Sequence, residues 1–192
     1  MNPFNYISIA QGDSFYDRVE ETKRIVDTLQ GGNNLVLLAP RRYGKTSLVF
    51  RAIERLEQQG VSCVYFDLMP VYSLESFAEL YLQALYTKLS SKDRLIQLIA
   101  ALKSIRPKIT FDAFGKPEFG IEFVEPKVGI ATIAQLLEMP EKIAQDGKRL
   151  VVVMDEFQEI RKLHKFGLEA LLRSKIQLLA DRKSGSAGMP RP

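Results

Sequence analysis

Two kinds of hydrophobic pattern take turns along the chain. Short continuous apolar runs, each bounded by turn-forming or polar residues, are typical of strands buried on both faces. They lie at residues 35–39, 61–68 and 150–154. Apolar residues spaced three or four apart predict amphipathic helices. This spacing occurs at residues 15–30, 45–59, 73–89, 90–105, 132–145 and 159–180. Strands separated by helices predict an α/β domain whose mostly parallel sheet is covered by helices.

Turn and capping residues refine the boundaries of these elements. Ser73 is the expected N-cap of its helix, with Ser76 as a weaker alternative, and Ser90 or Ser91 caps the next helix. A bend is expected at Met139-Pro140, because proline interrupts a helix.

The chain divides into three segments by character, and the second carries an insertion. Residues 1–33 form a lead-in and a helix, and residues 34–180 form the core. Residues 107–129 are rich in proline, glycine and phenylalanine, which predicts a hairpin or loop insertion with strands near 109–111 and 120–124. Residues 181–192 are polar and rich in Gly, Ser and Pro, so we expect a disordered tail.

Composition excludes several classes of site. The chain has 192 residues, of which 46% are hydrophobic and 26% charged, as in an ordinary globular domain. Its single cysteine, Cys63, excludes an internal disulfide or a CxxC site, and is expected to be a buried strand residue. Its single histidine, His164, is expected on a helix surface and excludes a zinc site built on several histidines. No apolar run of about 18 residues and no signal peptide is present, so the default location is cytoplasmic.

Charge leaves nucleic-acid binding as an alternative without favouring it. The net charge is +4 and the isoelectric point about 9.1, but basic residues are interleaved with acidic ones. Only two places are locally basic: Arg41-Arg42 with Lys45, and the end of the chain with Arg182, Lys183 and Arg191.

A phosphate-binding loop lies between the first predicted strand and the helix that follows it. The loop has the pattern G-x-x-x-x-G-K-[ST], with alanine in place of the first glycine. Its residues are Ala39, Pro40, Arg41, Arg42, Tyr43, Gly44, Lys45, Thr46 and Ser47. A bare GKT occurs by chance, but a buried strand before it and an amphipathic helix after it make the signal specific. The loop predicts ATP binding.

The chemistry of phosphate binding explains the residue types in this loop. Gly44 permits a backbone conformation that a side chain disfavours, and the helix beginning near Lys45 directs its positive end at phosphate. Lys45 is expected to stabilise charge on the β- and γ-phosphates, and Thr46 to bind Mg²⁺. Arg41 and Arg42 suit a loop tip near phosphate, although a solvated position fits Arg42 equally well.

The third predicted strand ends in two adjacent carboxylates. Asp155 is expected to hold Mg²⁺ through water, and Glu156 to act as general base on the attacking water. Ligands bind at the carboxyl ends of parallel strands, which is where this pair stands. The alternative is an Asp-Glu pair that only caps the following helix. Asp67, at the end of the second strand, either faces the same site or serves a turn.

The segments PRRYGKTSLV and VVVMDEFQEI together resemble prokaryotic AAA-like P-loop ATPases of the STAND, or archaeal-type, family. The resemblance extends to residues 15–20 and 172–177, and covers about residues 12–178. It implies a three-layer αβα P-loop fold, ATP and Mg²⁺ as ligands, and nucleotide-driven switching of attached domains. It also places Phe15 and Arg18 near the adenine.

The chain departs from the family pattern after residue 180. Relatives continue into a strand with a polar sensor residue, which lies between the loop strand and the acidic strand, and then into a lid domain. No apolar run follows residue 180, so we expect an incomplete sheet and a truncated domain. Each buried ladder hydrogen bond left unmade lowers the stability of the fold by about 1–3 kcal/mol. We therefore expect a less stable domain with impaired ATP hydrolysis.

Three functional readings follow. The first is the ATP-binding domain of a switch ATPase that hydrolyses ATP to ADP and phosphate. The second is a nucleotide-binding module that acts on a protein partner, or by self-association, without hydrolysis. The third is a fragment of a nucleic-acid motor or loader. Loss of phosphate release on Glu156→Gln favours the first, ATP-dependent partner affinity the second, and salt-sensitive DNA binding the third.

Overall fold

The computed structural model describes residues 18–38, 43–89, 92–111, 113–115, 117–124, 128–144 and 149–184. These residues fall into two units, 1–63 and 64–192, and each unit has buried side chains of its own.

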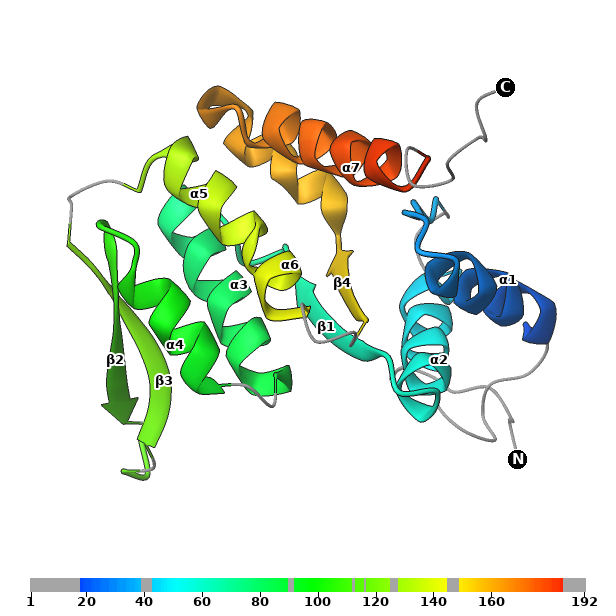
Figure 1. Cartoon of the computed structure of the whole chain (residues 1–192), viewed down its shortest axis with the longest axis horizontal. Helices are drawn as coiled ribbons and strands as arrows, with labels where there is room; N and C mark the ends of the chain where they lie inside the picture. Colours follow the sequence, from blue (N-terminus) through cyan, green and yellow to red (C-terminus); the bar gives the residue numbers. More distant parts are fainter. Residues whose placement is uncertain are drawn as a thin grey trace, which may run out of the picture. The chain divides into compact units, whose positions relative to one another are not determined.

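Two packed helices make up most of the first unit. Helix α1 (Val19–Gln30) contacts helix α2 (Lys45–Gln58), and both are visible in blue and cyan in Figure 1. Their buried side chains recur at helical spacing, as the sequence predicts. They are Thr22, Ile25 and Val26 in α1, and Leu48, Ala52, Ile53 and Leu56 in α2.

The predicted strand before the phosphate loop does not form over residues 35–38. These residues belong to neither of the two described sheets. Val36 is 69% exposed and Leu38 is 92% exposed. The prediction is wrong here because an apolar run supplies side chains for a strand, whereas a strand exists only where a neighbour supplies ladder hydrogen bonds. Ala39, the last residue of the predicted strand, lies outside the described residues.

A small parallel sheet joins two distant parts of the sequence. Strand β1 (Ser62–Asp67) pairs with strand β4 (Leu150–Asp155), which confirms the second and third predicted strands. The Leu68 N–H donates to the Asp155 carbonyl at 3.1 Å, so both strands end at the same edge. The α/β class and the small parallel sheet are therefore confirmed.

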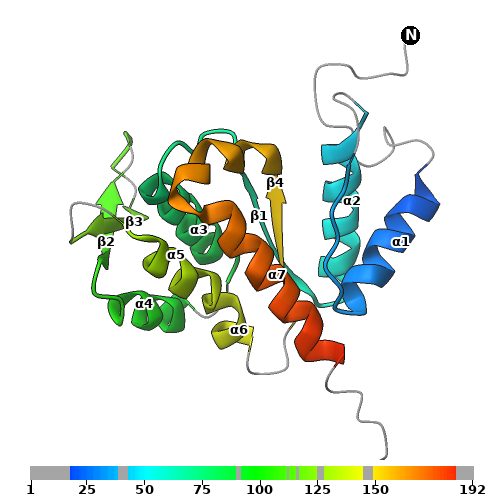
Figure 2. The ribbon, with the colours of Figure 1, turned by 90° about the horizontal axis from the view of Figure 1, so that it is seen from above.

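The second unit places helices, a hairpin and a 3-10 segment around a common core (Figures 1 and 2). The helices are α3 (Leu74–Lys88), α4 (Lys92–Ala100), α5 (Ile130–Leu137), α6 (Met139–Ile143) and α7 (Leu168–Ser184). Helix α3 carries most of the aromatic core. Phe66 of β1 meets Phe77 and Tyr81 of α3 edge to face, with ring centroids 6.2 and 5.5 Å apart.

Several predicted boundaries are confirmed in this unit. Ser73 caps α3, since its hydroxyl accepts the Ser76 N–H at 3.1 Å and the Ser76 hydroxyl accepts the Ser73 N–H at 2.9 Å. The bend at Met139-Pro140 separates α5 from α6. Burial of Cys63 and exposure of His164 are also as predicted.

The expected hairpin insertion is present and longer than predicted. Strand β2 (Ile105–Phe111) pairs antiparallel with β3 (Pro117–Phe123), with Ile105 opposite Phe123. The prediction that a helix continues to residue 105 is wrong. Helix α4 ends at Ala100, and Ile105, which is fully buried and β-branched, begins strand β2 instead.

The long helix predicted after the acidic strand is broken into two. A 3-10 segment, η3 (Phe157–Phe166), precedes α7, and Gly167 separates them at φ 75°. That left-handed conformation suits glycine and ends the first segment. Helix α7 continues to Ser184, and residues 185–192 of the expected tail lie outside the described residues. Over the described ranges, no helix has the length and apolar character needed to cross a membrane.

Phe77→Ala is expected to lower the free energy of unfolding by about 3–5 kcal/mol, because it empties a fully buried site in the core. Urea denaturation measures the change. Phe114→Ala is the control: this phenylalanine is 96% exposed, so its removal should change stability by about 0.5 kcal/mol or less. Equal effects of the two substitutions would contradict the assignment of α3 to the core.

Candidate functional site

The start of α2 forms the described part of the phosphate loop. Gly44 is the N-cap of α2 and has φ 69° and ψ 22°, the left-handed region. Apart from Gly44 and its neighbours along the chain, no described atom lies within 4 Å of the position that a Cβ on Gly44 would take, so here the backbone angle, not crowding, favours glycine. The Leu48 N–H donates to the Gly44 carbonyl at 3.0 Å, which closes the first helical turn over Lys45.

The first turn of α2 is suited to an anion. It contains Lys45, Thr46 and Ser47 and no acidic residue. A helix begins with N–H groups that have no partner within the helix, and its dipole makes this end positive. Ala39, Pro40, Arg41 and Arg42 of the predicted loop, and Phe15 of the predicted adenine side, lie outside the described residues.

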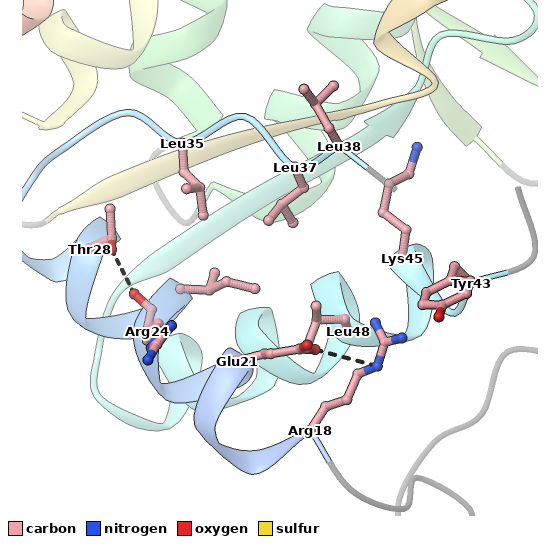
Figure 3. A pocket seen from close by; sticks show the side chains of 11 residues that line it. Arg18, Glu21, Arg24, Thr28, Leu35, Leu37, Leu38, Tyr43, Lys45 and Leu48 are labelled. Atoms are coloured by element: carbon pink, nitrogen blue, oxygen red, sulfur yellow. Dashed lines mark hydrogen bonds and ion pairs between the residues drawn. The ribbon is translucent and has the colours of Figure 1, made fainter. Parts of the chain in front are cut away.

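A pocket of about 400 Å³ lies beside this helix start, within the first unit (Figure 3). Its lining combines apolar side chains with a similar number of polar and charged ones. The apolar residues are Ile25, Leu35, Leu37, Leu38 and Leu48, and the polar ones are Arg18, Glu21, Arg24, Thr28, Tyr43 and Lys45.

Arg18 connects the beginning of α1 with the loop. Its guanidinium stands 5.4 Å from the centroid of the Tyr43 ring and 3.4 Å from the Glu21 carboxylate. The structure therefore brings Arg18, Tyr43 and Lys45, three residues predicted from sequence, around one pocket (Figure 3). Glu21 and Arg24 are lining residues that the sequence did not indicate.

The acidic strand end lies at the carboxyl edge of the β1–β4 sheet. Asp155 is buried, at 7% exposure. Its Oδ1 accepts the Glu156 N–H at 2.8 Å, and its Oδ2 accepts the Tyr65 hydroxyl at 3.1 Å. Glu156 is half-buried, and its carboxylate accepts the Gln158 side-chain amide.

The alternative that this pair only caps the next helix lacks geometric support. Glu156 occupies the N-cap position of η3, but its side chain makes no capping hydrogen bond. The Oδ1 of Asp155 binds the N–H of the very next residue, whereas a capping side chain binds an N–H two or three residues further on.

The carboxylates of Asp67, Asp155 and Glu156 act on the phenol of Tyr65, and we call these four residues the carboxylate cluster. Sequence analysis missed Tyr65. Burial first, and then the nearby carboxylates of Asp155, Asp67 and Glu156, raise the pKa of its phenol well above the usual range. The hydroxyl therefore stays protonated and donates. One signal was available: Tyr65 and Asp67 are two residues apart in a strand, which places both on one face.

Asp67 serves a turn, as one of its two predicted alternatives states. Its Oδ1 accepts the Met69 N–H at 2.8 Å. Its carboxylate also contributes to the negative field at Tyr65. Among the described residues, no three His, Cys, Asp or Glu side chains converge as a metal site. Magnesium sites on nucleotides use one or two protein ligands together with phosphate oxygens and water.

Comparison with known proteins decides the family. A family described as an ATPase domain predominantly from Archaea matches residues 15–184. The chain belongs to this family. The matched range contains Lys45 of the loop and Asp155 of the acidic strand end.

Two curated relatives are similar to this archaeal-type ATPase domain. An uncharacterized ATP-binding protein of Pyrococcus horikoshii is 28% identical over 152 residues, which is 78% of this chain and 45% of the relative. An uncharacterized ATP-binding protein of Methanocaldococcus jannaschii is 26% identical over 166 residues, 85% of this chain and 46% of the relative. The chain thus spans about half the length of each relative. No solved structure matches it.

Gly44→Ala is expected to lower the free energy of unfolding by about 1–2 kcal/mol, because alanine disfavours the left-handed conformation. It should also weaken binding of a fluorescent ATP analogue. Gly60→Ala is the matched control, since Gly60 has φ 78° and similar open space but follows the other end of α2. The control should lose similar stability and keep its nucleotide affinity. Equal affinity losses in both variants would contradict a nucleotide site at the start of α2.

Proposed function

We propose that this chain is the ATP-binding domain of a STAND-type switch ATPase, which hydrolyses ATP to ADP and phosphate to change the state of attached domains or partners. The observation that carries the proposal is the start of α2. There Gly44 adopts a left-handed conformation, Lys45 follows it, no acidic residue stands in the first turn, and a pocket of about 400 Å³ adjoins. Membership of an ATPase family supports this assignment.

Phosphate binding is assigned to the loop, and binding of the adenine is assigned to the neighbouring pocket. Lys45 and the first N–H groups of α2 hold the β- and γ-phosphates. Ala39 to Arg42 supply the rest of the loop. The adenine enters the pocket, where Arg18 and Tyr43 offer flat, polarisable surfaces together with apolar side chains. Phe15 is assigned to the same side from the sequence.

Magnesium is assigned to Thr46 and Asp155. The residues fit this ion, since a hydroxyl and a carboxylate are the hard oxygen donors that it prefers. When bound, the ion neutralises charge on the β- and γ-phosphates. Asp155 has two hydrogen-bond donors on its carboxylate and is therefore held in one orientation.

Glu156 is assigned as general base. It follows Asp155 directly and is half-buried at the strand edge. Its carboxylate takes the proton of the attacking water as the water adds to the γ-phosphorus and the bond from that phosphorus to the bridging oxygen breaks. The Gln158 amide, which donates to this carboxylate, orients it.

Nucleotide binding without hydrolysis is the second candidate. It is favoured by residues 35–38, which precede the loop and form no strand. A loop that no paired strand fixes retains its phosphate donors but holds attacking groups less rigidly. In that case the chain acts by nucleotide-dependent contact with a protein partner or with a second copy.

Lys45→Ala should weaken binding of a fluorescent ATP analogue with Mg²⁺ by at least about tenfold, because a charge-assisted contact contributes roughly 1.5–3 kcal/mol. Fluorescence anisotropy measures the change. Lys23→Ala removes an exposed lysine of α1 in the same unit and should bind as the unchanged chain does. An unaltered affinity in Lys45→Ala would sink the phosphate-loop assignment.

Glu156→Gln should leave ATP affinity nearly unchanged and lower steady phosphate release by about 10²–10⁴-fold, since the base is lost and the shape kept. Glu159→Gln is the control; it breaks only an ion pair with Lys162, 2.6 Å away. If the unchanged chain binds ATP and releases no phosphate, the second candidate replaces the first. If it releases phosphate and Glu156→Gln does so equally fast, Glu156 is not the base.

A further inference from the structure

The Asp155 carboxylate is oriented from two sides. The Glu156 N–H binds Oδ1 at 2.8 Å, and the Tyr65 hydroxyl binds Oδ2 at 3.1 Å. Tyr65 comes from β1 and Asp155 from β4, so the second bond spans two neighbouring strands and 90 residues of sequence. With a donor on each oxygen, the carboxyl plane is fixed about its terminal torsion, which is otherwise broad.

The pairing of β1 with β4 also fixes the position of Tyr65. Its ring lies half-buried on β1, and the Leu68 N–H, three residues later, binds the Asp155 carbonyl at 3.1 Å. The side chain of Asp155 is therefore bound to β1, and its carbonyl to the residue that directly follows β1. A carboxylate oxygen accepts more than one hydrogen bond or ligand, so a bond from Tyr65 or Glu156 does not by itself prevent metal binding.

We propose that Tyr65 is a positioning residue for magnesium: its hydroxyl holds the Asp155 carboxylate in the orientation that receives the hydrated ion. This inference rests on the proposed function, because it needs Asp155 to hold magnesium through the water bound to the ion. Partners behind a metal ligand orient it, and their loss typically weakens metal affinity by about 10–100-fold.

A purely structural bond makes a different prediction. If Tyr65 only joins β1 to β4, its loss lowers the melting temperature and leaves the magnesium dependence of nucleotide binding unchanged. If Tyr65 positions Asp155, magnesium dependence shifts whatever happens to the melting temperature.

The test compares Tyr65→Phe with the unchanged chain. Affinity for a fluorescent ATP analogue is titrated against Mg²⁺, and again in EDTA, at a temperature at which circular dichroism shows both proteins folded. The half-saturating Mg²⁺ concentration should rise about tenfold or more in Tyr65→Phe, with no change in EDTA. Direct Mn²⁺ binding in the presence of nucleotide, followed by electron paramagnetic resonance, should weaken by the same factor.

Two further variants complete the test. Tyr86→Phe removes a hydroxyl from a tyrosine of α3 that stacks on Phe119, and should leave the magnesium dependence unchanged. In an Asp155→Asn background, Tyr65→Phe should have no further effect, because the oriented carboxylate is already gone. Direct Mn²⁺ binding should likewise be unchanged by Tyr86→Phe, and in the Asp155→Asn background it should be unchanged by Tyr65→Phe.

The outcomes separate the inference from the proposed function. If the unchanged chain binds nucleotide more tightly with Mg²⁺ and Tyr65→Phe has the same magnesium dependence, the positioning role is overturned while the proposed function stands. An equal shift in the Asp155→Asn background also overturns it. If the unchanged chain shows no magnesium dependence, the metal assignment itself fails, and the role of Tyr65 fails with it.

Discussion

Pairing of β1 with β4 is the interaction on which the carboxylate cluster depends. The two strands are separated by more than 80 residues that form helices and a hairpin, yet they end at the same edge. Right-handed crossovers through packed helices make such parallel neighbours possible. Without this pairing, Tyr65 and Asp155 have no reason to meet, and the Asp155 carboxylate loses the hydrogen bond from the Tyr65 hydroxyl.

Backbone conformation at the ends of elements forms the second constraint. Gly44 and Glu156 both adopt left-handed angles, at φ 69° and φ 51°, where one element passes into the next. Glycine takes this conformation readily, whereas for glutamate it is uncommon and costs roughly 1–2 kcal/mol. Glu156 is the one residue other than glycine with positive φ among the described parts of the chain. Strained residues concentrate at functional sites, which agrees with a role for Glu156 beyond capping.

Opposite electrostatic environments characterise the two parts of the proposed chemistry. The start of α2 presents a helix N-terminus, a lysine and no acidic residue in its first turn. The edge of the β1–β4 sheet gathers Asp67, Asp155 and Glu156 around the Tyr65 phenol. A positive environment suits phosphate and a negative one suits a cation, so each environment agrees with the ligand proposed for it.

The sequence by itself determined the elements whose signals are local. Helical periodicity gave α2 and α3, Ser73 gave a cap, and continuous apolar runs gave β1 and β4, because each signal depends on neighbours along the chain. The motif GKT also placed Lys45 and Thr46 at a helix start. The reason is local, because Gly44 takes the left-handed conformation that directly precedes the helix.

Tertiary structure alone decided what depends on distant residues. Residues 35–38 are apolar enough for a strand but form none, since ladder partners are not encoded in the run itself. Tyr65 became part of the carboxylate cluster only through pairing with a strand about 90 residues away. Arg18 met Tyr43 because α1 packs on α2. Periodicity reports which face of an element is apolar, and packing decides which other element that face meets.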